Sequence, residues 1–188
     1  MENRYAARKD NPFGDCRQPS PEDIKKALGD LIMSASGWRK VFAADGDENS
    51  LSPGLACPDL FLTAGMGHAF AGYLKAVSGK SRPRAALGTD TRRTGPLMAD
   101  IIARSLLSLG CEVLFLSALP APEIMAFVRN EENIDGFLYI SASHNPPGHN
   151  GVKFGLNRGS VLSGTEIGPL IESYKKLAEA ADFCRMMT

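Results

Sequence analysis

The sequence predicts an α/β fold, a three-layer α/β/α sandwich with a mixed, mostly parallel sheet. From residue 84 onward, short apolar runs alternate with segments whose apolar residues recur at helical spacing, which is typical of strand–helix–strand units. The runs 111–117 (CEVLFLS) and 136–140 (GFLYI) are apolar almost throughout, as expected of strands buried on both faces. A short apolar run, 152–154, follows its predecessor so closely that we expect an antiparallel pair, which makes the sheet mixed.

The first helix is expected to begin after Ser20. Ser20 can cap it, Pro21 suits its first position, and two acidic residues follow near the positive end of the helix dipole. The helix should end before Gly37. Its predicted apolar face consists of Ile24, Leu28, Leu31 and Ile32.

The remaining elements follow from the same patterns of apolar spacing and of Gly and Pro. Thr94 is expected to cap one helix and Gly110 to close it, and Pro122 opens the next. In chain order, the predicted elements are a strand within 38–44, a turn at 45–50, a helix at 59–77, a strand at 84–88, the helix between Thr94 and Gly110, a strand at 111–117, a helix at 123–130, strands at 136–140 and 152–154, and a helix from about 165 to 181.

Composition excludes several classes of protein. The chain has 188 residues, with 21 Lys and Arg balanced by 21 Asp and Glu, so clustered positive charge for nucleic acid or an anionic membrane is not expected. Aromatic residues, at 7%, are too few to suggest a base-stacking surface. No segment approaches the roughly 20 apolar residues of a membrane span, and residues 1–10 lack the apolar run of a signal peptide. We expect a cytoplasmic protein with an N-terminal arm at 1–19 and one domain at 20–188.

The four cysteines lie far apart in the sequence, at Cys16, Cys57, Cys111 and Cys184. No C-x-x-C pair occurs, which excludes the usual zinc-ribbon and thioredoxin patterns. We therefore expect four reduced thiols.

One loop has the composition of a reactive site. Residues 141–151 (SASHNPPGHNG) follow a predicted strand and combine hydroxyls, imidazoles and amides on a backbone stiffened by two prolines. Ser143 precedes a histidine, and Lys153 follows the loop closely, so a hydroxyl nucleophile would have a proton acceptor and a cation nearby. The competing interpretation from composition is an ordinary surface turn.

A longer motif favours the reactive site. Segment 141–147 (SASHNPP), continued by Asn150, Gly151 and Lys153, resembles the phosphoserine loop of the α-D-phosphohexomutases, T-A-S-H-N-P-x-x-x-N-G-x-K, with Ser141 where Thr is usual. That family includes phosphoglucomutase and phosphomannomutase.

Two shorter segments lie upstream in the order that this family has. Residues 36–39 (SGWR) are similar to the end of its G-T-S-G-x-R segment, and residues 88–94 (GTDTRRT) resemble its G-x-D-x-R-x-[ST] loop. The resemblance covers about residues 34–180 and leaves 1–19 unexplained.

The resemblance implies the roles of the site residues. Ser143 would carry a phosphoryl group, donate it to a hexose phosphate and recover it from the hexose 1,6-bisphosphate that forms. Lys153 would be an acid/base group whose pKa a neighbouring cation, Arg39 or Mg²⁺, could lower. Arg39 would position the phosphoserine or the lysine, and His144 would contact the sugar or the phosphoryl group. Substrate and phosphate would be bound by Ser143, His144, Asn145 and Lys153, and Mg²⁺ by the phosphate on Ser143.

Plainer interpretations stand beside these roles. Lys153 could be an exposed strand cation, and His144 could orient a turn through a hydrogen bond. We expect His149 to face solvent. Asp90 and Arg92 are assigned a structural role, in which Asp90 accepts backbone N–H bonds in its own turn and Arg92 braces that loop by an ion pair.

Residues 45–48 (DGDE) are expected to form a turn. They superficially resemble the family's metal loop, D-G-D-x-D-R, but the third acid is out of place and the segment precedes the serine loop instead of following it. His144 and His149 lack further ligands at a suitable spacing, so a zinc site is not expected.

Phosphohexomutases are built of four domains, and this sequence resembles the first. The resemblance therefore implies the phosphoserine-bearing domain of a mutase that interconverts hexose 1-phosphate and 6-phosphate. The remaining domains of the same polypeptide would be its partners, and the isolated fragment would be inactive. The alternatives are a free-standing, non-catalytic module that binds a sugar phosphate or a protein, and a different phosphoryl or acyl transferase that uses the same serine.

Overall fold

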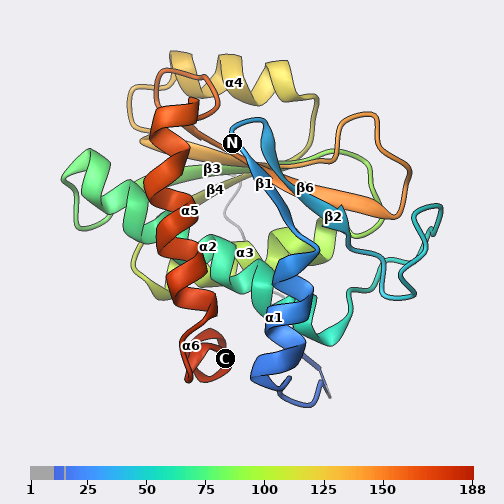
Figure 1. Cartoon of the computed structure of the whole chain (residues 1–188). Helices are drawn as coiled ribbons and strands as arrows, with labels where there is room; N and C mark the ends of the chain where they lie inside the picture. The colour runs from blue at the N-terminus through green and yellow to red at the C-terminus, as the bar shows by residue number, and fades with distance from the viewer. Residues whose placement is uncertain (1–10, 15) are drawn as a thin grey trace.

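The computed structural model describes residues 11–14 and 16–188. Figure 1 shows their arrangement. The helices are α1 (Pro21–Gly29), α2 (Cys57–Ser78), α3 (Gly95–Ser108), α4 (Ala121–Asn130), α5 (Gly164–Ala178) and α6 (Phe183–Met187). The strands are β1 (Ile32–Ser34), β2 (Gly37–Val41), β3 (Arg84–Thr89), β4 (Glu112–Ala118), β5 (Gly136–Ile140) and β6 (His149–Leu156).

The strands form one mixed sheet in the order β1-β2-β6-β5-β3-β4. Strands β3, β4 and β5 pair in parallel, whereas β6 pairs antiparallel with both β5 and β2, and β1 pairs antiparallel with β2. β2 thus runs in the same direction as β3, β4 and β5. The predicted mixed sheet and the predicted antiparallel strand at 152–154 are both confirmed.

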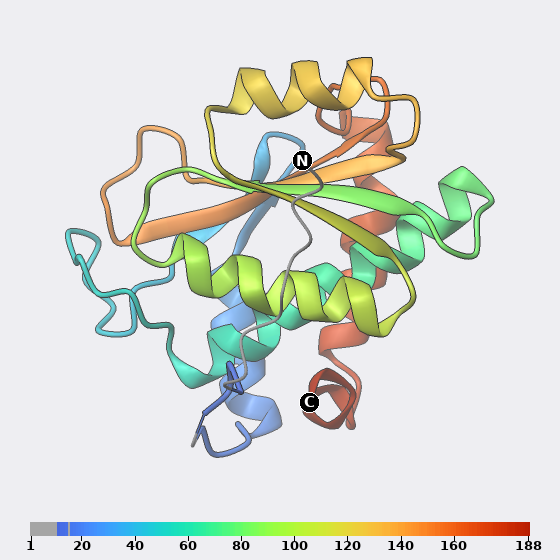
Figure 2. The ribbon, with the colours of Figure 1, turned by 180° about the vertical axis from the view of Figure 1, so that it is seen from behind.

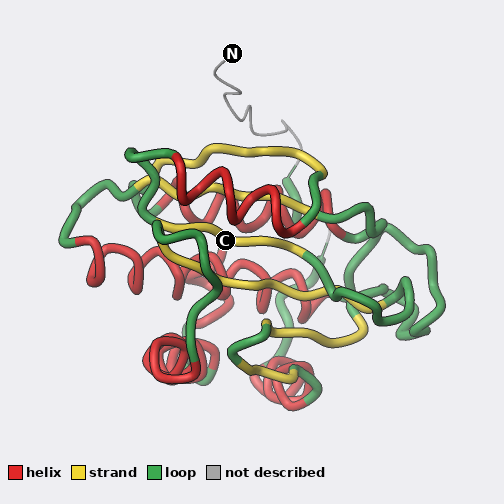
Figure 3. The backbone as a smooth tube through the Cα atoms, turned by 90° about the horizontal axis from the view of Figure 1, so that it is seen from above, coloured by secondary structure: helices red, strands yellow, loops and turns green. Residues whose placement is uncertain are grey.

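Helices cover both faces of the sheet, as the sandwich requires (Figure 2). Helices α1, α2, α3, α5 and α6 contribute to the larger core on one face. Among the described elements, helix α4 alone packs on the other face, against a smaller cluster from β3 and β5. Figure 3 looks onto the sheet from the side of α4 and shows the strands lying side by side behind this helix. The predicted α/β/α sandwich is confirmed.

The larger core is centred on aromatic rings beneath β2 and β6. Trp38 is fully buried, and its ring centroid lies 4.7 Å from those of Phe154 and Tyr174. Helix α2 is apolar on nearly all sides, and most of its side chains are buried because it packs against α1, α3 and α5. These aromatic contacts therefore hold β2 and β6 against the helices of the larger core.

The first helix is shorter than predicted. Helix α1 begins with the expected cap at Ser20, which the structure shows to be a capping box with Asp23, but it ends at Gly29. Ile32, placed on its apolar face by helical spacing, instead begins strand β1 and is 56% exposed. The reason is long-range pairing: Ile32 is the register partner of Arg39, and Gly37, at φ +132°, allows the tight turn between β1 and β2.

The strand at 111–117 is confirmed, but its predicted burial on both faces is wrong. β4 is the edge strand of the sheet, and its side chains are half-buried or exposed. An apolar run in the sequence carries no information about how many strands or helices flank it. A central strand and this edge strand therefore have similar sequences.

The later helices lie where spacing predicts them, with α5 ending at Ala178 instead of about 181. Gly110 closes α3 with a φ of +79°, as expected. No helix among residues 11–14 and 16–188 is long and apolar enough to cross a membrane.

Two of the four thiols are not free. Cys16 forms a disulfide with Cys57 at the start of α2, so the expectation of four reduced thiols is wrong for this pair. Cys111 and Cys184 are free and buried, and burial raises the pKa of both thiols. The pairing depends on tertiary contact, which wide spacing could not reveal. Residues 1–10 and 15 of the predicted arm lie outside the described residues, and the division into arm and domain stays a prediction.

Candidate active site

The predicted nucleophile loop, residues 141–151, consists of the connection 141–148 between β5 and β6 and the first three residues of β6, at the carboxyl edge of the parallel strands. The Ser141 amide donates to the Gly151 carbonyl at 2.9 Å, and the Ser141 hydroxyl accepts the Ser143 amide at 3.0 Å. The Asn145 side chain donates to the Ala142 carbonyl at 2.7 Å. Ser143 is exposed and has a φ of +58°, a left-handed backbone conformation that residues other than glycine adopt rarely.

All five residues predicted for the site line one hollow of about 210 Å³. They are Arg39, Ser143, His144, Asn145 and Lys153. Arg39 comes from β2 and Lys153 from β6, whereas the other three belong to the loop. The structure thus brings together residues that are more than 100 positions apart in the sequence.

The strand register explains why the two cations share a side of the sheet. Arg39 is the partner of Gly151 on the neighbouring strand, and Lys153 lies two residues farther along that strand. Side chains two residues apart point to the same face. The position between them must be glycine, because a Cβ on Gly151 would lie 2.1 Å from the Trp38 carbonyl oxygen.

The same face is only partly covered. Tyr139 is the register partner of Lys153 and belongs to the small cluster beneath α4. Helix α4 packs on β3 and β5, toward the β4 edge (Figure 2). The part of the sheet formed by β2 and β6 therefore presents Arg39 and Lys153 to the hollow beside the serine loop.

Lys153 has the electrostatics of an acid/base group. Burial, and after it the positive charge of Arg39, lowers the pKa of its ammonium group. Its Nζ also donates to the Ser36 carbonyl at 2.7 Å, which holds it at the turn between β1 and β2. A larger fraction of this lysine is neutral at a given pH than of a solvated one.

Substitution of Arg39 by Met is expected to raise the pKa of Lys153, because it removes the neighbouring positive charge while keeping an apolar stem of similar length. The measurement is an NMR titration of the protein after reductive ¹³C-methylation of its lysines. Arg129→Met, on α4, is the matched control and should leave this titration unchanged. An unchanged Lys153 pKa in Arg39→Met would contradict the electrostatic coupling.

The two histidines of the loop differ. The His144 side chain is exposed and makes no hydrogen bond to any residue that the structure describes. His149 was predicted to face solvent, but its side chain is only 21% exposed and its Nε2 lies 3.6 Å from a Glu48 carboxylate oxygen. The 45–50 turn packs beside the loop at this point, since the Gly148 amide donates to the Glu48 carbonyl. His144 is thus the imidazole that remains accessible in the hollow.

Asp90 and Arg92 have the structural role predicted for them, and Arg92 has a further one. Asp90 accepts the Arg92 amide at 2.9 Å and its Nε at 3.2 Å. The guanidinium also reaches carbonyl groups of the nucleophile loop, which sequence reasoning missed because the two segments are about 50 residues apart. The predicted side-chain cap by Thr94 on α3 is wrong. The Thr94 hydroxyl instead accepts a hydrogen bond from the side-chain amide of the buried Asn150 at 2.8 Å.

Residues 11–14 and 16–188 contain no group of three or more His, Cys, Asp or Glu side chains that could hold a metal ion. The predicted turn at 45–50 is confirmed: Asp45 accepts the Ser50 hydroxyl at 2.6 Å and the Asp47 amide at 3.2 Å. These carboxylates therefore serve the turn itself.

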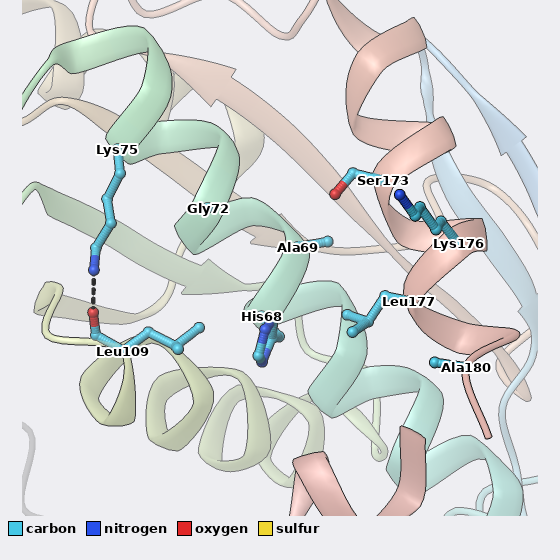
Figure 4. Close-up of a pocket in the computed structure, with 9 residues that line it drawn as sticks. All are labelled: His68, Ala69, Gly72, Lys75, Leu109, Ser173, Lys176, Leu177 and Ala180. Carbon is cyan, nitrogen blue, oxygen red and sulfur yellow. Dashed lines mark hydrogen bonds between the residues drawn. The ribbon is translucent and has the colours of Figure 1, made fainter. Parts of the chain in front are cut away.

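Another hollow, of about 430 Å³, lies among the helices on the other face of the sheet (Figure 4). His68 and Leu177 face it from α2 and α5, and Lys75 donates to the Leu109 carbonyl at its end. Burial lowers the pKa of His68. None of the predicted site residues lies there, so this hollow is separate from the candidate active site.

Comparison with known proteins identifies related sequences. Residues 32–181 match the family model described as phosphoglucomutase/phosphomannomutase, alpha/beta/alpha domain I. The chain is 42% identical over 96 residues to a phosphoglucomutase/phosphomannomutase of Thermococcus kodakarensis, which covers 51% of this chain and 20% of that protein. It is 33% identical over 136 residues to a phosphoglucosamine mutase of Clostridioides difficile, and this match covers 72% of this chain and 29% of that protein. The chain thus spans less than a third of these relatives.

A solved structure shares the fold. A phosphoglucomutase/phosphomannomutase family protein from Burkholderia thailandensis superposes with a TM-score of 0.58 at 23% identity, over 77% of this chain and 31% of that one. At this level of identity, the likeness shows the fold alone.

Proposed function

Because the chain belongs to the phosphoglucomutase/phosphomannomutase family and matches its α/β/α domain I, we propose that it is the phosphoserine-bearing part of a phosphohexomutase. Ser143 would carry the phosphoryl group. The observation that carries this proposal is the hollow in which Ser143, His144 and Asn145 from one loop meet Arg39 and Lys153 from two strands.

The proposed reaction is a transfer between two oxygen atoms. The P–O bond to Ser143 Oγ breaks, a P–O bond to a hydroxyl of a hexose monophosphate forms, and a hexose bisphosphate results. The hydroxyl loses one proton and Oγ gains one. Lys153 is the candidate carrier of that proton, because its lowered pKa lets it release a proton more readily than a solvated lysine does. In the return step, the other phosphoryl group of the bisphosphate passes back to Ser143.

The other residues of the hollow would bind and orient. Arg39 would offset the negative charge of the transferring phosphoryl group and keep the pKa of Lys153 low. His144, exposed beside the serine, would contact the sugar or the phosphoryl group, and Asn145 would contribute to the same binding site. His144 is free to do so because it has no hydrogen-bond partner among the residues that the structure describes.

Mg²⁺ is part of the proposal, but this chain offers little to hold it. No cluster of three metal-ligating side chains occurs among the described residues, so the chain's own ligand would be a phosphoryl oxygen on Ser143. When bound, Mg²⁺ would offset charge on the transferring group. The other ligands would come from remaining domains, since the chain spans 20–29% of the two relatives named above. The isolated chain is therefore expected to show negligible mutase turnover, whereas a single, slow phosphoryl transfer to Ser143 stays within reach of the residues of the hollow.

Phosphorylation of Ser143 tests the proposal. The chain, incubated with glucose 1,6-bisphosphate and Mg²⁺, is expected to gain one phosphate, which peptide mass spectrometry should place on Ser143. Ser143→Ala should gain none, and the matched control Ser160→Ala should behave like the unmodified sequence. No added phosphate, or phosphate on another residue, would count against the mutase assignment. Binding of the bisphosphate without transfer would favour the non-catalytic sugar-phosphate module instead.

A further inference from the structure

The Arg92 guanidinium lies at the centre of the nucleophile loop, although Arg92 itself belongs to the segment that follows β3. Its Nη2 donates to the carbonyl oxygens of Ser143 at 3.0 Å and Asn145 at 2.6 Å. Its Nη1 donates to those of Pro146 at 2.5 Å and His149 at 2.9 Å. The Arg92 side chain is only 11% exposed.

These contacts use the whole donor capacity of the group. A guanidinium has five N–H bonds, and here four meet loop carbonyls while the Nε–H meets the Asp90 carboxylate at 3.2 Å. The Asp90 carboxylate also balances the positive charge. The guanidinium therefore has no N–H left for a phosphate, in contrast to Arg39, whose side chain lines the hollow.

The loop needs such a partner because its carbonyl groups converge. Four carbonyl oxygens directed at one point repel each other and, being partly shielded from water, require donors. In addition, Ser143 has a left-handed backbone, a conformation that persists only where surrounding contacts hold it. A planar fork of five donors satisfies both requirements in a way that the point charge of a lysine cannot.

The far end of the loop is fixed from the same segment. Asn150 is fully buried, donates to the Thr94 hydroxyl at 2.8 Å and accepts the Gly151 amide at 2.9 Å. The segment after β3 thus holds the loop at two points.

We propose that Arg92 is the positioning residue of the nucleophile: by binding four carbonyl groups of the loop, it holds Ser143 in the backbone conformation that directs its hydroxyl into the hollow with Lys153 and Arg39. The inference rests on the proposed function of Ser143. It assigns Arg92 no contact with substrate.

The test compares Arg92→Lys, which keeps the charge and loses the fork, with Arg93→Lys, its exposed neighbour, as the matched control. Two quantities are measured. The first is amide hydrogen exchange at Ser143, Asn145 and His149, whose amides bond within the loop. The second is the rate and concentration dependence of Ser143 phosphorylation by glucose 1,6-bisphosphate.

In Arg92→Lys, exchange at these amides should become faster by about tenfold or more. The maximal phosphorylation rate should fall by about tenfold or more, while the concentration for half-maximal rate stays the same. Addition of guanidinium ion to Arg92→Ala should restore part of the rate. The Arg93→Lys control should change neither quantity.

Unchanged exchange in Arg92→Lys would overturn the proposal, as would faster exchange with an undiminished maximal rate. A higher bisphosphate concentration for half-maximal rate, at the same maximal rate, would make Arg92 a phosphate ligand and would likewise overturn the proposal. If the unaltered chain takes up no phosphate, the proposed function fails, and the exchange measurement still decides whether Arg92 holds the loop. If neither Arg92→Lys nor Arg92→Ala folds, the unaltered chain decides. The amides of Ser143, Asn145 and His149 must then exchange more slowly than those of the exposed 45–50 turn, and equal exchange rates would overturn the proposal.

Discussion

Replacing Lys40 by Met is expected to lower the free energy of unfolding by about 3–5 kcal/mol at neutral pH. Lys40 lies on β2 beside Arg39, with its Nζ 2.7 Å from the Asp59 carboxylate and 3.2 Å from the Ala27 carbonyl. Both charged side chains are less than a tenth exposed. Removal of the lysine would leave a carboxylate buried without its countercharge, which is far more costly than the loss of a surface ion pair.

The size of this loss should depend on pH. Burial raises the pKa of Asp59 even with Lys40 present, and loss of the lysine would raise it further. A folded-state pKa above the unfolded one means that the penalty is absent below the unfolded pKa, grows as the pH rises from the unfolded to the folded pKa, and is constant above it. The stability deficit of Lys40→Met should therefore be smaller near pH 4 than near pH 7.

Urea denaturation of the unaltered chain and of Lys40→Met across this pH range measures the effect. The double variant Lys40→Met with Asp59→Leu is the control, because it removes both charges and should recover much of the lost stability. A deficit that stays constant with pH would show that the loss comes from packing of the lysine stem instead of the stranded carboxylate.

Trp38→Ala is expected to cost about 3–5 kcal/mol of unfolding free energy. The ring is fully buried between Phe154 and Tyr174, so its removal leaves a large cavity at the point where β2 and β6 join the helical layer. Thermal and urea unfolding, followed by far-ultraviolet circular dichroism, measure the loss.

The matched comparison is Trp38→Phe. The Trp38 Nε1–H is buried and has no hydrogen-bond partner among the described residues, so its loss removes an unsatisfied donor along with some ring volume. The phenylalanine variant should therefore lose much less stability than the alanine variant. Equal losses in the two variants would mean that the indole nitrogen contributes through an interaction that the described residues do not show.

Local signals in the sequence predicted most of the fold. The cap at Ser20 and the helix end at Gly110 could be predicted because a helix end depends on the residues next to it. The predicted end of the first helix was wrong because Ile32 fits an amphipathic helix as well as a strand. The strand pairing of Ile32 with Arg39 decides between the two. The edge position of β4 is likewise a property of the whole sheet.

The candidate site divides in the same way. The motif around Ser143 identified the loop, and the resemblance supplied Arg39 and Lys153, which the structure brings to one hollow. The contact of Arg92 with the loop could not be inferred, since nothing in residues 88–94 indicates which distant carbonyl groups a guanidinium will meet. Only the adjacency of β3 and β5 in the sheet places the two segments together.

The antiparallel pairing of β5 with β6 has a consequence for the order in which the site forms during folding. The two strands and the serine loop make a hairpin of neighbouring residues, and local hairpins close within microseconds. The contact of Lys153 with Ser36 spans 117 residues and must await the docking of β2, which carries Arg39. We expect the folding chain to present its serine early and to surround it with cations late, so that chemical competence is a property of the completed fold alone.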